Sequence, residues 1–285
     1  MHSIYRSENG KQSLAQRYRE FFEFWPQGTR QIRVPTRQGE TFVVSCGSDD
    51  GPPLVLLHGA GSNSAMWITD AVSWSAHFKI YAIDIIGEPG FSAETRPPLD
   101  SDAHAEWLDD VLQGLGIQRF SLVGMSLGGW LALDFAARQP SRVDRMALIV
   151  PGGIGRQRVG FLFKVLPLML LGDWGRKKAL DLVVGGRQSS SADARGQQSY
   201  RNFMALVQRH FRPRMERLPI FCNEALHKLT MPVLVVLGAK DVILDSADTK
   251  RRLEEHAPSA EICFLAEVGH GVFGERERMF RFLTN

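Results

Sequence analysis

Short runs of apolar residues recur along the chain and predict the strands of a sheet. Most of these runs contain few polar positions, which is typical of strands that are buried on both faces. Two runs near the start are separated by Gln38-Gly39, and this spacing predicts a β-hairpin. The predicted strands are residues 31–36, 41–46, 54–57, 79–83, 120–123, 146–150, 233–237 and 262–265.

Amphipathic helical patterns lie between these runs, at residues 102–115, 127–138, 249–256 and 275–283. Strands that alternate with helices are typical of a mostly parallel sheet with helices on both faces. We therefore expect an α/β fold built on a mostly parallel eight-stranded sheet. An apolar stripe through Leu14, Tyr18 and Phe21 also predicts a helix in an N-terminal segment, residues 1–28, that packs on the domain.

The alternation of strands and helices stops after residue 150, and about 80 residues separate that strand from the next one. A plain connection of this length is uncommon in a compact domain. The intervening residues contain helix-like stretches, so we expect an inserted helical cap at residues 154–228. The core would then consist of residues 29–153 and 229–285.

Charge is distributed unevenly, although the net charge of the whole chain is only +3. Between Arg156 and Lys228 the chain has 14 Lys/Arg and 5 Asp/Glu residues, so this segment carries +9 and the remainder −6. Solvated basic helix faces would account for this pattern. The functional alternative is that the segment steers anionic substrates or contacts an anionic surface.

Composition narrows the class of protein. Hydrophobic residues make up 44% and charged residues 23% of the 285, as in a globular domain of enzyme size. Three widely spaced cysteines form no disulfide framework or zinc pattern, which favours a reducing, cytoplasmic compartment. The start lacks the apolar region of a signal peptide, and the most apolar stretch, residues 159–172, is too short to span a membrane. We expect no stable membrane insertion and no nucleic-acid partner, and predict no oligomeric state.

The central chemical signal is a Gly-x-Ser-x-Gly pattern at residues 124–128, with Ser126 in the middle. The pattern follows a predicted buried strand and opens a predicted helix, which is the context of a nucleophile elbow. On so sharp a turn, side chains two residues before and after the serine would collide, and glycine avoids the collision. The sequence therefore predicts Ser126 as a nucleophile.

A serine nucleophile needs a general base, and the base needs a carboxylate that orients it. Asp241 and His270 each follow a predicted strand. They come after Ser126 in the order Ser, Asp, His, which is the order expected with a nucleophile elbow. Asp245 and Asp248 compete for the acid role but lie further past the strand. The other seven histidines lie in the unstructured start, in the loop after the third predicted strand, or in or beside helical patterns. Asp241 and His270 are therefore the predicted acid and base.

Two backbone N–H groups are predicted to bind the oxyanion of the tetrahedral intermediate that a serine nucleophile forms. One belongs to Leu127, at the start of the helix after the nucleophile. The other comes from the loop His58-Gly59-Ala60-Gly61, where Ala60 is the first choice and Gly61 the second. We expect His58 to stabilise this loop rather than to react.

Together these motifs resemble those of the α/β-hydrolase superfamily, and of its carboxylesterase-like serine hydrolases with a helical cap in particular. The resemblance runs from about residue 31 to the end, and the cap matches least. It implies hydrolysis of a small-molecule carboxylic ester through an acyl-enzyme, without metal or organic cofactor. The alternatives are cleavage of C–C bonds in dienoate (meta-cleavage) products, a lyase or haloperoxidase activity, and a ligand sensor.

One departure from the family pattern lies in residues 84–92, where Asp-x-x-Gly-x-Gly-x-Ser is one residue longer. This loop borders the active site in relatives, so its length puts substrate analogies in doubt. We expect the substrate pocket to be apolar and to include Gly61, Met125, Phe161 and Phe163, although ordinary packing would also explain the two phenylalanines. An apolar pocket predicts faster turnover of medium-chain than of acetyl esters.

Overall fold

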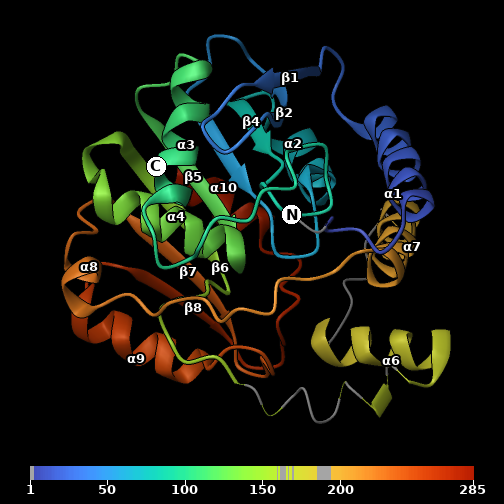
Figure 1. Cartoon of the computed structure of the whole chain (residues 1–285). Coiled ribbons are helices and arrows are strands. Elements are labelled where there is room, and N and C mark those ends of the chain that lie inside the picture. The colour runs from blue at the N-terminus through green and yellow to red at the C-terminus, as the bar shows by residue number, and fades with distance from the viewer. Residues whose placement is uncertain (1–2, 159, 161–164, 166, 169, 185–193) are drawn as a thin grey trace.

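The protein is described by a computed structural model that covers residues 3–158, 160, 165, 167–168, 170–184 and 194–285 (Figure 1). Eight strands form one sheet in the order β1-β2-β4-β3-β5-β6-β7-β8. The first pairings, β1 with β2 and β2 with β4, are antiparallel, and all the others are parallel. The strands are β1 (Arg30–Val34), β2 (Thr41–Gly47), β3 (Pro53–Leu57), β4 (Lys79–Ile83), β5 (Phe120–Met125), β6 (Val143–Ile149), β7 (Val233–Gly238) and β8 (Glu261–Leu265).

Helices connect these strands and cover both faces of the sheet. The α-helices are α1 (Glu8–Glu20), α2 (Ile68–Trp74), α3 (Ala103–Gly114), α4 (Leu127–Arg138), α6 (Gly172–Val184), α7 (Ala194–His210), α8 (Asn223–His227), α9 (Ser246–His256) and α10 (Arg276–Thr284). Short 3₁₀ helices occupy η1 (Phe21–Phe24), η2 (Ser64–Trp67) and η3 (Pro140–Arg142). No helix in the described ranges is long and apolar enough to cross a membrane.

The fold predicted from the apolar runs is confirmed, since all eight strands appear in one mostly parallel sheet. The expectation that the apolar runs are buried on both faces was wrong for β8. Its residues are partly buried or exposed, and Phe264 is 40% exposed, because β8 is the last strand of the sheet, beside β7, in the described part of the chain. Helix α2 was not predicted from the sequence.

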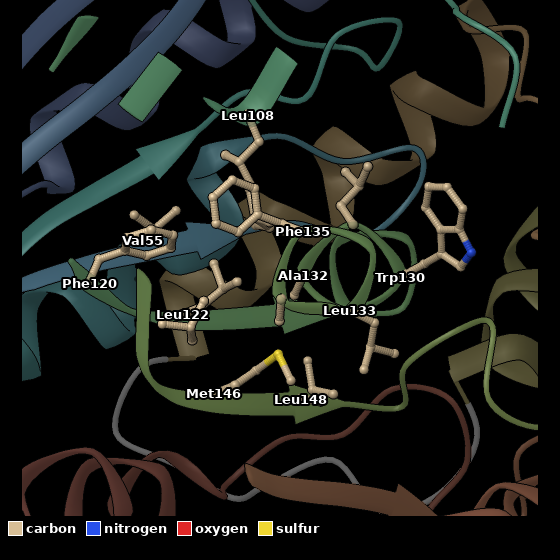
Figure 2. Close-up of a cluster of buried hydrophobic side chains, with 14 of the residues drawn as sticks. Val55, Leu108, Phe120, Leu122, Trp130, Ala132, Leu133, Phe135, Met146 and Leu148 are labelled. Carbon is tan, nitrogen blue, oxygen red and sulfur yellow. The ribbon is translucent and has the colours of Figure 1, made fainter. Parts of the chain in front are cut away.

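The core consists of two hydrophobic clusters, one on each face of the sheet. Successive side chains of a strand point to opposite faces, so Leu54 and Leu56 of β3 join one cluster, whereas Val55 and Leu57 join the other. Helices α3, α4, α8 and α9 cover the face of Val55, and α1, α2, α7 and α10 cover the opposite face. Figure 2 shows side chains of α3 and α4 on the face of Val55. The sheet is therefore enclosed by helices on both sides.

The N-terminal segment packs against α7, which belongs to the segment inserted between β6 and β7. Helices α1 and α7 lie side by side in Figure 1, and the ring of Tyr18 lies 6.4 Å from that of Phe203. The N–H of Arg6 donates to His210 O at 2.8 Å, and the N–H of Arg212 donates to Ile4 O at 2.8 Å. The start of the chain is thus fixed to the end of α7 by backbone hydrogen bonds as well as by aromatic packing.

Candidate active site

Ser126 lies in the turn between β5 and α4, in a backbone conformation that few residues adopt. Its φ is 52° and its ψ is −107°. Such strain costs on the order of 1–3 kcal/mol and persists only where the surrounding structure enforces it. A Cβ on Gly124 would lie 2.4 Å from the carbonyl oxygen of Gly128, and a Cβ on Gly128 would lie 2.2 Å from that of Leu57. Both positions therefore require glycine, for the steric reason that the sequence pattern indicated.

Backbone hydrogen bonds from the end of β6 hold this turn in place. The N–H of Ser126 donates to Ile149 O at 2.9 Å, and the N–H of Gly152 donates to Ser126 O at 3.1 Å. Val150, which lies between Ile149 and Gly152, is fully buried and has a φ of 40°. The two non-glycine residues with positive φ in the described part of the chain thus follow the ends of the paired strands β5 and β6.

The structure brings Ser126, His270 and Asp241 together in one chain of hydrogen bonds. His270 Nε2 lies 3.0 Å from Ser126 Oγ, and His270 Nδ1 lies 2.7 Å from Asp241 Oδ2. The other carboxylate oxygen, Asp241 Oδ1, accepts the N–H groups of Ile243 at 2.7 Å and Leu244 at 2.9 Å. These two bonds fix the orientation of the carboxylate, whose side chain is fully buried.

The two competing carboxylates have other partners. Asp245 Oδ1 accepts the N–H of Asp248 at 3.2 Å at the start of α9, and it also pairs with Arg158 at 3.1 Å. Asp248 pairs with Arg251 at 2.7 Å. Neither carboxylate contacts His270, so Asp241 alone of the three has the geometry of an orienting acid.

The two predicted oxyanion donors belong to the residue after Ser126 and to the loop after β3. Leu127 is the first residue of α4. Ala60 lies in the loop after β3, and a Cβ built on Gly59 of that loop would lie 3.8 Å from Ser126 Cβ. Within the part of the chain that the structure describes, the N–H groups of Ala60 and Leu127 have no acceptor. Both groups are therefore available to a substrate oxygen.

The N–H of Gly61, the second choice for the oxyanion donor, is already used. It donates to Glu88 Oε2 at 2.6 Å. Glu88 belongs to loop 84–92, is only 2% exposed, and was not singled out by sequence reasoning. Burial raises the pKa of its carboxyl to about 7, while the Gly61 N–H and the cations of Arg96 and Arg214 oppose this rise. The extra residue in loop 84–92 is the sequence signal that could have drawn attention to this position.

His58 joins the loop after β3 to Ile85 by hydrogen bonds. Its Nε2 accepts the N–H of Ile85 at 2.9 Å, and its Nδ1 lies 2.8 Å from Gly59 O. A nitrogen that accepts a backbone N–H carries no proton, so the ring is neutral with its hydrogen on Nδ1. Burial lowers the pKa of His58, in agreement with this state. The residue therefore bridges two loops, and both of its ring nitrogens are occupied by backbone groups.

Helix α7 approaches the site at the loop after β3, which sequence reasoning missed. Tyr200 Oη lies 2.6 Å from Ser62 Oγ, and a Cβ on Gly61 would lie 3.9 Å from Val207 Cγ1.

Met125 is partly buried at the end of β5, next to Ser126. Phe161 and Phe163 lie outside the described residues, so their place in the predicted pocket is untested. Among the described residues, no group of three or more His, Cys, Asp or Glu side chains could hold a metal ion.

Comparison with known proteins identifies the family. A model described as "Alpha/beta hydrolase family" matches residues 54–282. The chain is 30% identical over 292 residues to the "Uncharacterized carboxylesterase nap" of Bacillus subtilis (strain 168), and the match covers 98% of this chain and 94% of that protein. The structure of naproxen esterase (carboxylesterase NP) from Bacillus subtilis is similar, with a TM-score of 0.80 and 29% identity over 97% of this chain and 98% of that one. Carboxylesterase CesB (YbfK) from the same species also has a TM-score of 0.80, with 27% identity over 96% and 98% of the two chains. The chain belongs to the α/β hydrolase family.

Proposed function

We propose that this protein is a carboxylesterase in which Ser126, His270 and Asp241 form the catalytic triad. The observation that carries the proposal is the hydrogen-bond chain from Asp241 Oδ2 through His270 to Ser126 Oγ. Asp241 accepts a hydrogen bond from His270 Nδ1, which places the ring hydrogen on Nδ1 and leaves the Nε2 lone pair for the serine hydroxyl. Carboxylesterases that match over nearly the whole chain support ester hydrolysis as the reaction.

Acylation begins when Ser126 Oγ attacks the carbonyl carbon of the ester while His270 Nε2 takes its proton. The carbonyl oxygen becomes an oxyanion, which accepts hydrogen bonds from the N–H groups of Ala60 and Leu127. The intermediate then collapses, and the C–O bond to the alcohol breaks. His270 Nε2 gives its proton to the leaving alcohol, and the acyl group remains on Ser126 Oγ.

Deacylation repeats these steps with water. His270 Nε2 takes a proton from a water molecule as its oxygen attacks the acyl carbon. The second intermediate collapses, the bond to Ser126 Oγ breaks, and the serine oxygen recovers the proton from His270. The carboxylic acid leaves, and the enzyme returns to its starting state without a cofactor.

Two features of the fold stabilise the developing negative charge. Leu127 is the first residue of α4, and the N-terminus of a helix carries a partial positive charge. Loss of one oxyanion donor typically costs about 10²–10³ in turnover. The Ala60 and Leu127 N–H groups have no acceptor of their own among the described residues, so no existing bond has to break when the oxyanion forms.

Replacement of the nucleophile tests the proposal. We expect Ser126→Ala to lose on the order of 10⁶-fold in kcat on p-nitrophenyl esters, because the remaining groups cannot form an acyl-enzyme. Ser121→Ala, on the same strand, is the matched control and should keep wild-type turnover. Ester turnover by Ser126→Ala near the wild-type rate would overturn the proposal. Cleavage of a dienoate together with no cleavage of any ester would favour the C–C hydrolase instead.

We further propose an apolar acyl pocket that includes Gly61, Met125, Phe161 and Phe163. Met125 supports this proposal, because its apolar side chain is partly buried and it is the residue before Ser126. A series of p-nitrophenyl esters from acetate to decanoate measures the preference, and kcat/KM should reach its maximum at medium chain length. A kcat/KM that falls steadily from acetate upward would contradict the pocket and leave the triad unaffected.

A further inference from the structure

Loop 84–92 is hydrogen-bonded to the loop after β3, and contacts within loop 84–92 fix its conformation. Asp84 Oδ2 accepts the N–H of Phe91 at 2.8 Å, and a Cβ on Gly90 would lie 2.4 Å from the same oxygen. Gly87 has a φ of 74°, and its N–H donates to Ala93 O at 2.8 Å. These constraints close the loop on itself and direct the side chain of Glu88 into the protein.

Several hydrogen bonds join loop 84–92 to the loop after β3. Asn63 Nδ2 donates to Pro89 O at 2.9 Å, and Ser64 Oγ donates to Asp84 Oδ1 at 2.6 Å. The residue that follows Ala60 is also tied to loop 84–92, because the N–H of Gly61 donates to Glu88 Oε2 at 2.6 Å. Gly61 also has a φ of 67°, a conformation that glycine adopts without the cost that other residues pay.

We propose that Glu88 is a positioning residue that holds the Gly61 peptide and thereby directs the Ala60 N–H toward the oxyanion. The inference rests on the proposed function, in which Ala60 is one of the two donors. Glu88 acts through Gly61 and does not contact the reacting atoms. By occupying the Gly61 N–H, it also decides which of the two candidate groups in the loop remains free to bind the substrate.

The surroundings of Glu88 explain why a carboxylate can serve here. The side chain is almost fully buried, and its charged neighbours are Arg96 and Arg214. Tyr5 is the other titratable group that its charge affects. A carboxylate accepts an N–H more strongly than a neutral oxygen does, by roughly a factor of two. Near pH 7 the group therefore changes between a stronger and a weaker acceptor for Gly61.

Substitution of Glu88 separates its role in positioning from a role in folding. We expect Glu88→Ala to lower kcat by about 10- to 100-fold with KM within about threefold of wild type, because a misplaced donor acts mainly in the transition state. Rates are normalised to sites titrated with a fluorophosphonate, so that misfolded protein does not count. Glu94→Ala is the matched control, because Glu94 follows the same loop but binds Ser3, Ile4 and Lys11, away from the site. It should retain wild-type kcat.

The conservative variant supplies a second readout. Glu88→Gln retains a side-chain oxygen for Gly61 but cannot ionise, whereas the pH dependence of the rest of the site is common to both proteins and cancels in a ratio. We expect the ratio of wild-type to Glu88→Gln kcat to be near one at pH 6 and to rise about threefold or more by pH 8. A flat or falling ratio, or a Glu88→Ala kcat equal to wild type, would overturn the inference.

Failure of this inference and failure of the proposed function give different results. If Ser126→Ala retains turnover, the triad is wrong and Glu88 has no oxyanion donor to position. If Ser126→Ala is inactive while Glu88→Ala turns over at the wild-type rate, the triad stands and only the positioning role is lost.

Discussion

The turn that carries Ser126 and the loop that carries Ala60 lie beside each other at one edge of the sheet, but different contacts hold them. The Ser126 turn is held by backbone groups of β6 and by glycines that leave no room for a side chain. The Ala60 loop is held by side chains from elsewhere, chiefly Glu88 on Gly61 and Asp84 on Ser64.

This difference separates two kinds of sequence requirement. A turn restrained by backbone sterics depends on residues within it, so its pattern is visible over a few positions. A loop restrained by distant side chains depends on another loop, and its own sequence does not indicate which side chains will restrain it. The two halves of the same site should therefore respond differently to substitution and to pH.

The largest effect is expected where the orienting carboxylate is neutralised. Asp241→Asn should lower kcat by about 10⁴-fold, because an amide at this position favours the wrong tautomer of His270. Steady-state kinetics on a p-nitrophenyl ester measure the loss, and Asp245→Asn is the control that should retain most of the activity. A loss of less than tenfold in Asp241→Asn would show that the hydrogen bond to Asp241 does not orient the base.

A substitution in the Ser126 turn tests the backbone half of the comparison. Gly128→Ala should lower the free energy of unfolding by about 3 kcal/mol, because its Cβ would collide with the backbone of Leu57. Gly116→Ala is the control, since Gly116 has a φ of 72° and open space around it, so only the left-handed strain of about 1–2 kcal/mol applies. Chemical denaturation measures both. Equal losses in the two variants would show that crowding at the turn is not what demands glycine.

The pH dependence of stability tests the side-chain half. Burial raises the pKa of Glu88 from 4.5 to about 7, so the folded protein holds a proton that the unfolded chain has lost. Stability from this group is therefore complete below about pH 4.5 and is lost as the pH rises through about 7. Glu88→Gln lacks this loss. The free energy of unfolding of Glu88→Gln minus that of wild type should therefore rise by roughly 2 kcal/mol between pH 5 and pH 8. Denaturation curves at both pH values measure the difference, and an unchanged difference would contradict the shifted pKa.

The triad geometry was predictable because parallel strands bring their carboxyl ends to one edge of the sheet. Ser126, Asp241 and His270 each follow a strand, and the fold places β5, β7 and β8 so that their loops meet. The steric demand at residues 124 and 128 is likewise local. The catalytic roles of the three residues and the helical cap at residues 154–228 remain predictions, as does the cytoplasmic location.

Contacts between distant loops and helices were not predictable. The direction of the Glu88 side chain depends on how loop 84–92 closes, and the sequence indicated only that the loop is one residue longer. The amphipathic pattern of α1 shows which face is buried but not that α7 covers it. For the same reason, the approach of Tyr200 to Ser62 could not be read from the pattern of α7.

Covalent labelling of the nucleophile tests the central claim most directly. Wild-type protein treated with a fluorophosphonate should gain the mass of one adduct, located on the peptide that contains Ser126, and should lose ester turnover in proportion to labelling. Ser126→Ala should gain no adduct under the same conditions. An adduct on another residue, or ester turnover that survives complete labelling of Ser126, would contradict the account.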